Sequence, residues 1–280
     1  MQGKTVIITG ANSGMGLAST IELARRGAHV VMACRSPERG QKAWEAAIRE
    51  SGSDRLELML CDLGSLDSIR KFAGEVTERY GAIDVLLNNA GVVSLKRELT
   101  KDGFESMLGV NHLGHFLLTN LLLDSLKRAE EGRIVNVSSG AYKIGKIHED
   151  PSLVRGFNVA KGYAQSKLAN ILFTKELARR LEGTRVTANC LHPGAVATNI
   201  GVDRNTGFGK SLVGLLRPFF LTAEQGAETA IYLASSPEVK GVTGQYFYKK
   251  QARPLTARGE NPDSARRLWE WSEEQVGLKR

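Results

Sequence analysis

Short apolar runs rich in β-branched residues alternate along the chain with longer stretches whose apolar residues recur every three to four positions. The short runs predict seven strands, at about residues 4–9, 28–34, 55–60, 83–88, 133–138, 185–191 and 243–247. The longer stretches predict helices between them. Because connections between parallel strands are right-handed, the helices are expected on both faces of one sheet. The pattern therefore predicts an α/β fold with a doubly wound, mostly parallel, seven-stranded sheet.

No break in this alternation divides the chain. Its 280 residues contain no repeat of fixed period and no low-complexity linker, and 42% of them are apolar, enough for one substantial core. We predict a single domain over residues 1–280. Within it we expect a substrate loop at about 198–221 and a C-terminal extension at about 249–280.

A glycine-rich turn follows the first predicted strand directly and leads into an amphipathic stretch that ends near Arg26. Strand, glycine turn and helix form the start of a Rossmann-type dinucleotide-binding unit, in which the backbone approaches a pyrophosphate at the helix N-terminus. No Lys-Ser/Thr pair follows, which argues against a P-loop. A tight turn without a ligand is the alternative. The candidate cofactor residues here are Gly10, Asn12, Ser13, Gly14, Met15 and Gly16.

Tyr163 and Lys167 lie four positions apart in a stretch with helical periodicity, so both side chains are expected on one helix face. A phenol has a pKa of about 10, and a nearby cation in an enclosed cleft lowers it. Such a pair suits proton transfer. Taken alone, the same spacing also describes an ordinary solvated helix face.

Four further segments lie at the ends of predicted strands or in a later helix: Asn88 to Gly91, Asn111, Ser139, and Pro193 with Gly194. In this order, and with Tyr163 and Lys167, the chain resembles the short-chain dehydrogenase/reductase family over nearly its whole length. The segments YAQSKLANILFTKELARRLEG, LHPGAVAT and SARRLWEWSEEQVGL resemble the retinol dehydrogenase branch and its bacterial relatives.

The resemblance implies an enzyme that transfers a hydride between a nicotinamide and a carbonyl or alcohol carbon. It assigns catalytic roles to Asn111, Ser139, Tyr163 and Lys167. Tyr163 would exchange the proton, while Lys167 would lower the phenol pKa and bind the cofactor ribose. Ser139 would hydrogen-bond the substrate oxygen, and Asn111 would hold a water for proton relay. Ser138 is the neighbouring candidate, but family motifs of the form N-x-S-S-x place the catalytic hydroxyl second.

The resemblance also implies cofactor contacts beyond the glycine turn. Asp62 and Leu63 should border the adenine, Asn88, Ala90 and Gly91 the ribose side, and Tyr163 and Lys167 the ribose itself. Pro193, Gly194, Val196 and Thr198 should lie at the nicotinamide end. Asp62 and Thr198 are also suited to capping the helices that follow them.

The end of the second predicted strand favours NADP(H) over NAD(H), although NAD(H) remains possible. An NAD-preferring fold usually has a carboxylate at this point, where this chain has Cys34. Arg35 follows, and its planar guanidinium suits a 2′-phosphate. Arg39, one helical turn further on, either assists or is merely exposed.

Two loops carry the information about the substrate. Ser139 and Tyr163 are 24 positions apart, about a dozen more than in the shorter family members. The additional loop, roughly 141–162, either borders the substrate entrance or is a disordered insertion. The stretch from Thr198 to Leu221 mixes glycines with bulky apolar residues, as in a lid over an apolar substrate such as a retinoid or a lipid aldehyde or ketone. Packing against the core or another subunit would use the same residues. A polar ketone substrate and a catalytically silent NADP(H)-binding module are the other hypotheses.

Composition excludes several other functions. The formal charge is +8, but basic residues occur as pairs among acidic ones, without an aromatic-basic motif, so no nucleic-acid binding is expected. The scattered histidines, and three cysteines without paired spacing, predict no metal site and reduced thiols. The first strand begins near the N-terminus, so we expect no signal peptide or membrane anchor and a cytoplasmic enzyme. The family resemblance suggests a homo-oligomer.

Overall fold

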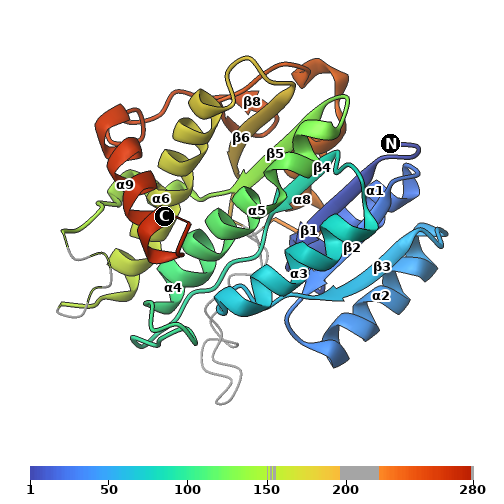
Figure 1. The fold of residues 1–280 in the computed structure, drawn as a ribbon, viewed down its shortest axis with the longest axis horizontal. Coiled ribbons are helices and arrows are strands. Elements are labelled where there is room, and N and C mark those ends of the chain that lie inside the picture. The colour runs from blue at the N-terminus through green and yellow to red at the C-terminus, as the bar shows by residue number, and fades with distance from the viewer. Residues whose placement is uncertain (150, 152, 154–155, 196–220, 279–280) are drawn as a thin grey trace.

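An eight-stranded sheet forms the centre of the molecule, in a computed structural model that describes residues 1–149, 151, 153, 156–195 and 221–278 (Figure 1). The strand order is β3-β2-β1-β4-β5-β6-β7-β8. The strands are β1 (Thr5–Thr9), β2 (His29–Cys34), β3 (Leu56–Leu60), β4 (Val85–Asn88), β5 (Gly132–Val137), β6 (Val186–His192), β7 (Tyr246–Tyr248) and β8 (Gln251–Ala252). The first seven are parallel, which confirms the predicted doubly wound sheet.

The eighth strand is the one addition to the predicted seven. β8 pairs antiparallel with β7 through a two-residue hairpin turn at Lys249 and Lys250. Both lysines have positive φ, 51° and 62°, the conformation that such tight hairpins require. Because this turn usually contains Asn or Gly, the Lys-Lys sequence did not indicate a hairpin.

Helices cover both faces of the sheet, as predicted. They are α1 (Gly14–Arg25), α2 (Pro37–Ser51), α3 (Leu66–Arg79), α4 (Ser106–Leu108), a π-helical turn η1 (Gly109–Leu113), α5 (Gly114–Arg128), α6 (Val159–Arg180), α8 (Ala223–Ser235) and α9 (Pro262–Gln275), with 3₁₀ turns η2 (Gly140–Ile144) and η4 (Pro237–Val239). Buried residues of α1, α2 and α8 share one apolar cluster with the sheet. Those of α3, α5, α6 and α9 share another on the opposite face.

The C-terminal helix α9 lies against α6 and α5 (Figure 1). Its Trp269 is 4% exposed and packs edge-on against Phe116 of α5, with ring centroids 4.8 Å apart, and also contacts Phe173 of α6. The guanidinium of Arg180 stacks over the indole at 4.3 Å. The predicted C-terminal extension therefore contributes directly to the core.

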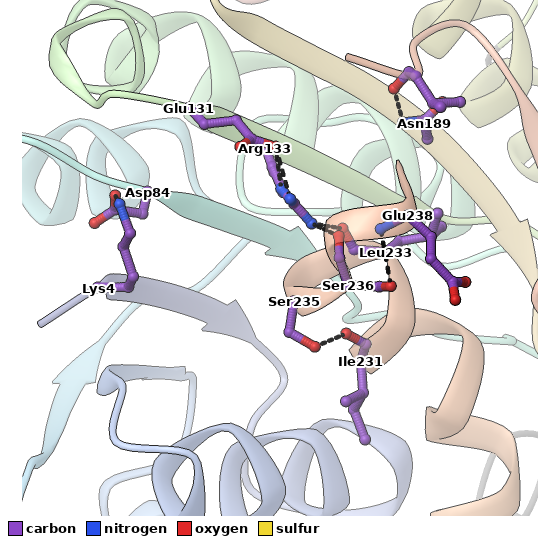
Figure 2. Close-up of polar contacts among 11 residues, drawn as sticks. Lys4, Asp84, Glu131, Arg133, Asn189, Ile231, Leu233, Ser235, Ser236 and Glu238 are labelled. Atoms are coloured by element: carbon purple, nitrogen blue, oxygen red, sulfur yellow. Dashed lines mark hydrogen bonds and ion pairs between the residues drawn. The ribbon is translucent and has the colours of Figure 1, made fainter. Parts of the chain in front are cut away.

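Polar contacts fix the amino-terminal edge of the sheet (Figure 2). Lys4, just before β1, forms an ion pair of 2.9 Å with Asp84, just before β4. The guanidinium of Arg133 in β5 binds Glu131 and donates to the carbonyls of Leu233 and Ser236 at the end of α8. The loops that carry the predicted site residues leave the opposite, carboxyl-terminal edge of the sheet. Among the described residues, no helix has both the length and the apolar character needed to cross a membrane.

Candidate active site

The loops that leave β1, β4, β5 and β6 meet at the carboxyl-terminal edge of the sheet, because parallel strands all end there. Gly10 after β1 lies so close to Ala90 after β4 that a Cβ on the glycine would be 3.0 Å from the Cα of Ala90. Gly140 after β5 donates its amide to the ring of His192 at the end of β6. Most of the residues predicted for catalysis and cofactor binding gather along this edge.

Helix α6 presents Tyr163 and Lys167 on one face, as the sequence predicts. Asn158 starts the helix by accepting hydrogen bonds from the amides of Ala160 and Lys161. The Nζ atom of Lys167 lies 5.6 Å from the centroid of the Tyr163 ring. Lys167 is only 4% exposed, and Nζ donates to the carbonyl of Val137 at 3.3 Å. The ammonium is thus held in an enclosed site.

The two neighbouring serines after β5 have different environments. Ser138 is buried and donates to the carbonyl of Lys167 at 2.8 Å, so its hydroxyl holds α6 against the sheet. Ser139 is half-buried, accepts from the Ala141 amide and lies close enough to the Tyr163 phenol to lower the pKa of that group. Only Ser139 therefore lies beside the phenol, which agrees with the choice made from the sequence.

The expected lowering of the Tyr163 pKa by Lys167 is not found. Burial is the largest influence and raises the pKa of Tyr163, against an opposing influence of the Ser139 hydroxyl. Burial also lowers the pKa of Lys167 to about 8. With the ammonium 5.6 Å from the ring centroid, desolvation outweighs its attraction for a phenolate. The phenol therefore keeps its proton at neutral pH.

Asn111 lies in the π-helical turn η1, and its side chain is fully engaged. Its amide nitrogen donates to Val92 O and Ser166 Oγ, both at 3.0 Å, and its Oδ1 accepts from Val92 N at 2.7 Å. A Cβ on Gly91 would lie 3.5 Å from Lys167 Nζ and 3.6 Å from Asn111 Oδ1. Asn111 therefore positions the loop after β4 beside Lys167, while a water-holding role stays a prediction.

The glycine turn fits a pyrophosphate. A Cβ on Gly16 would be 2.3 Å from the carbonyl of Gly10, so only glycine allows helix α1 to start this close to β1. The N-cap residue Ser13 makes no side-chain cap hydrogen bond, and the first turn of α1 has no acidic residue. By contrast, side chains cap α2, α3, α6, α8 and α9. The free amides and positive dipole end of α1 therefore suit an anionic ligand.

Comparison with known proteins agrees with this geometry. The sequence profile of the family described as short chain dehydrogenase matches residues 4–207. The chain belongs to the short-chain dehydrogenase/reductase family. It is thus an oxidoreductase of the kind that acts on an alcohol or carbonyl group.

The similar proteins place the chain in the retinol dehydrogenase branch of that family. It is 48% identical to retinol dehydrogenase 14 of Homo sapiens, over 99% of this chain and 88% of that one. A crystal structure of an uncharacterized protein from Mycobacterium paratuberculosis is 36% identical, covers 99% of this chain and 94% of its own, and superposes with a TM-score of 0.78. A variant of actinorhodin polyketide ketoreductase with NADPH is 28% identical, covers 87% and 94%, and has a TM-score of 0.67.

In this short-chain dehydrogenase, the two asparagine side chains of the Asn-Asn-Ala-Gly segment at the end of β4 bind other residues of the chain. The side chain of Asn88 points into the core, where it donates to Thr119 and Asn136 at 2.9 and 2.8 Å. Asn88 is 2% exposed, so its side chain holds the core together, and its contact on the ribose side stays a prediction. Asn89 instead donates to Thr9 O, which leaves the backbone of Ala90 and Gly91 at the edge.

On the predicted adenine side, Leu63 is 7% exposed and its side chain packs in the core. Its contact with the adenine stays a prediction. Asp62 is partly exposed, accepts from Gly64 N at 3.0 Å and pairs with Lys101 at 3.4 Å. The cap of α3 is Ser65, so the capping alternative for Asp62 is wrong.

The end of β2 has the predicted arrangement. Cys34 is 1% exposed, and burial raises its thiol pKa to about 12. Arg35 and Arg39 are both exposed. The charge of Arg39 is close enough to oppose the rise in the Cys34 pKa, so both cations lie near this strand end.

The sequence prediction missed two histidines and a threonine. His115 is 2% exposed and neutral, since burial lowers its pKa to about 4. Its Nδ1 donates to Asn111 O, so its Nε2 accepts the Thr9 hydroxyl at 2.9 Å. Thr9 in turn accepts the amides of Asn89 and Ala90. Only its nearness in sequence to Asn111 indicated a link between His115 and the site.

His192 is the other histidine, and its only sequence indication was its place directly before Pro193 and Gly194. Those two residues follow β6 at the carboxyl-terminal edge of the sheet, whereas Val196, Thr198 and nearly all of the predicted lid lie outside the described residues. In the part of the chain that the structure describes, no cluster of His, Cys, Asp and Glu side chains is suited to a metal ion.

Proposed function

We propose that this chain is an NADP(H)-dependent oxidoreductase of apolar carbonyl compounds and the corresponding alcohols. The observation that carries the proposal is that the Ser139 hydroxyl lies close enough to the Tyr163 phenol to lower its pKa, with Lys167 on the same helix face as the phenol. A protonated phenol and a hydrogen-bond donor side by side suit reduction of a carbonyl group.

The roles of the side chains follow from their environments. When bound, the nicotinamide exchanges the hydride with the substrate carbon. Ser139 donates a hydrogen bond to the substrate oxygen, and Tyr163, whose pKa is raised by burial, donates the proton to it. Lys167, with a pKa of about 8, returns a proton toward the tyrosine. Asn111 keeps the Gly91 loop in place next to this lysine.

The preference for NADP(H) rests on charge at the end of β2. The position of the usual carboxylate is taken by the buried, neutral Cys34, and two exposed arginines, Arg35 and Arg39, lie beside it. Guanidinium groups match a 2′-phosphate, whereas the Cys34 thiol at the usual carboxylate position gives a ribose 2′-hydroxyl no charged acceptor. The NADPH in the related ketoreductase structure supports the same preference.

The preference for an apolar substrate rests on the name of a relative and on an exposed apolar side chain near Ser139. The name of the retinol dehydrogenase relative points to a retinoid. In this chain, Ile144 lies on the 3₁₀ turn that Ser139 caps, and it is 73% exposed although large and apolar. Such an exposed side chain close to the reacting groups suits contact with an apolar substrate.

Turnover by the purified chain tests the proposal. NADPH and NADH would each be offered with retinal, medium-chain aldehydes and polar ketones, and their kcat/KM values compared. We expect the highest kcat/KM with NADPH and an apolar aldehyde, and loss of turnover in Tyr163→Phe with NADPH binding retained. A higher kcat/KM for polar ketones would contradict the apolar assignment, and NADPH binding without turnover of any carbonyl would favour a silent binding module.

A further inference from the structure

His192 joins the two loops on either side of the reaction centre. Its Nδ1 accepts the amide of Gly140 at 3.2 Å and the amide of Gly194 at 3.3 Å. Gly140 directly follows Ser139, and Gly194 belongs to the turn after β6. One ring nitrogen therefore holds the backbone beside the catalytic hydroxyl and the backbone of the Pro193-Gly194 turn.

The ring is fixed in this position from behind. It stacks on Tyr248 of β7, with centroids 4.9 Å apart and an interplanar angle of 15°. On its other side the ring lies against the backbone of Gly140, where a Cβ would lie 3.4 Å from Nε2, an ordinary van der Waals contact. Stacking and backbone contact leave the imidazole little freedom to turn Nδ1 away.

The two hydrogen bonds to Nδ1 require one particular protonation state of His192. Two backbone amides can only donate, so Nδ1 must offer its lone pair and the proton must lie on Nε2. Protonation of Nδ1 would place an N–H against two N–H groups and break both bonds. Among the described residues, the charged and titratable groups that face the ring are Lys143 of η2 and Tyr248, and Lys249 Nζ lies 5.6 Å from the centroid of the Tyr248 ring.

We propose that neutral His192 is a positioning residue that sets Ser139 relative to the Pro193-Gly194 turn and is released by protonation. The proposal rests on the proposed function, since it is the carbonyl reaction that needs Ser139 in place. Burial and the nearby Lys143 lower the pKa of His192, so release is expected in acid, below about pH 6.5.

Two matched variants separate the hydrogen bonds from the ring. His192→Asn keeps an acceptor, since the asparagine Oδ1 occupies the place of Nδ1, but has no group that titrates. His192→Phe keeps a ring to stack on Tyr248 but has no acceptor. We expect kcat/KM within about threefold of wild type for the first variant and about 100-fold lower for the second, as for a misplaced catalytic group. The acid limb of the wild-type pH profile should be absent in His192→Asn.

Amide NMR gives a measurement that does not depend on turnover. The Gly140 and Gly194 amide resonances of the wild type should titrate together below about pH 6.5, and those of His192→Asn should not. If His192→Phe keeps wild-type kcat/KM, or if both amides titrate unchanged in His192→Asn, the positioning role is wrong. If the wild type turns over no carbonyl, the proposed function fails, and the two amide titrations alone decide whether His192 joins the loops.

Discussion

The burial of Lys167 in the candidate active site lowers the stability of the fold. Burial lowers its pKa from 10.5 to about 8, so the folded state holds the charged form less well than the unfolded state does. A shift of this size corresponds to about 3 kcal/mol. The cost is present in full below pH 8. Between about pH 8 and 10.5 the unfolded chain binds more protons than the folded one, so stability should rise with pH.

Lys167→Met should therefore raise the free energy of unfolding at pH 7 while abolishing turnover. The carbonyl that the lysine contacts keeps a partner, because Asn170 Nδ2 also donates to Val137 O at 3.1 Å. Urea unfolding at pH 7 and pH 10 would test this, with the exposed Lys161→Met as a control on the same helix. A variant that is less stable at pH 7, or that still reduces carbonyls, would contradict the assignment.

The two adjacent serines allow a matched comparison. Ser139→Ala should lower kcat/KM about 100-fold with little effect on stability, because its hydroxyl faces the phenol. Ser138→Ala should cost about 1 kcal/mol of stability, because it removes a buried hydrogen bond of 2.8 Å to Lys167 O. Steady-state kinetics and urea unfolding of both variants check these outcomes. An equal loss of activity in both would mean that the two hydroxyls do not have separate roles.

At the scale of elements, Arg133 fastens the end of α8 to β5 (Figure 2). Its side chain is 11% exposed and donates to the carbonyls of Leu233 and Ser236, at 3.2 and 2.8 Å. Arg133→Met should cost about 2 kcal/mol, because these carbonyls and Glu131 lose a charged donor. Its kcat/KM should stay near wild type, since Arg133 lies at the edge opposite the site. Lys127→Met, on the exposed end of α5, is the control, and urea midpoints are the measurement.

Elements with a regular pattern could be predicted from the sequence, and elements that depend on distant contacts could not. The strand predicted at 243–247 begins only at Tyr246. Before it, side chains of Asn189 and Thr243 replace part of the ladder, by binding Val242 O, Gln245 N and Ala188 N. The π-helical turn around Asn111 has no periodicity of its own. In the site, residues of strong motifs such as Tyr163 were placed correctly, whereas Asn88 and His192 depend on what the fold brings beside them.

At the scale of the whole molecule, α9 joins the end of the chain to the active site. Ser272 of α9 donates to Leu268 O, so it accepts from His112 Nε2 at 2.8 Å. His112 lies next to Asn111 in the π-helical turn. The predicted homo-oligomer stays a prediction.

Trp269→Ala tests how far the molecule depends on this helix. The indole is buried between Phe116, Phe173 and Arg180, so its loss should cost about 4 kcal/mol of unfolding free energy. Because α9 also supports the turn that carries Asn111, kcat/KM should fall as well, even under conditions where the variant is fully folded. Arg267→Ala, on the exposed side of the same helix, should change stability by less than about 0.5 kcal/mol. Urea unfolding and steady-state kinetics of both variants are the measurements. If folded Trp269→Ala keeps the wild-type kcat/KM, α9 contributes to stability alone and does not support the active site.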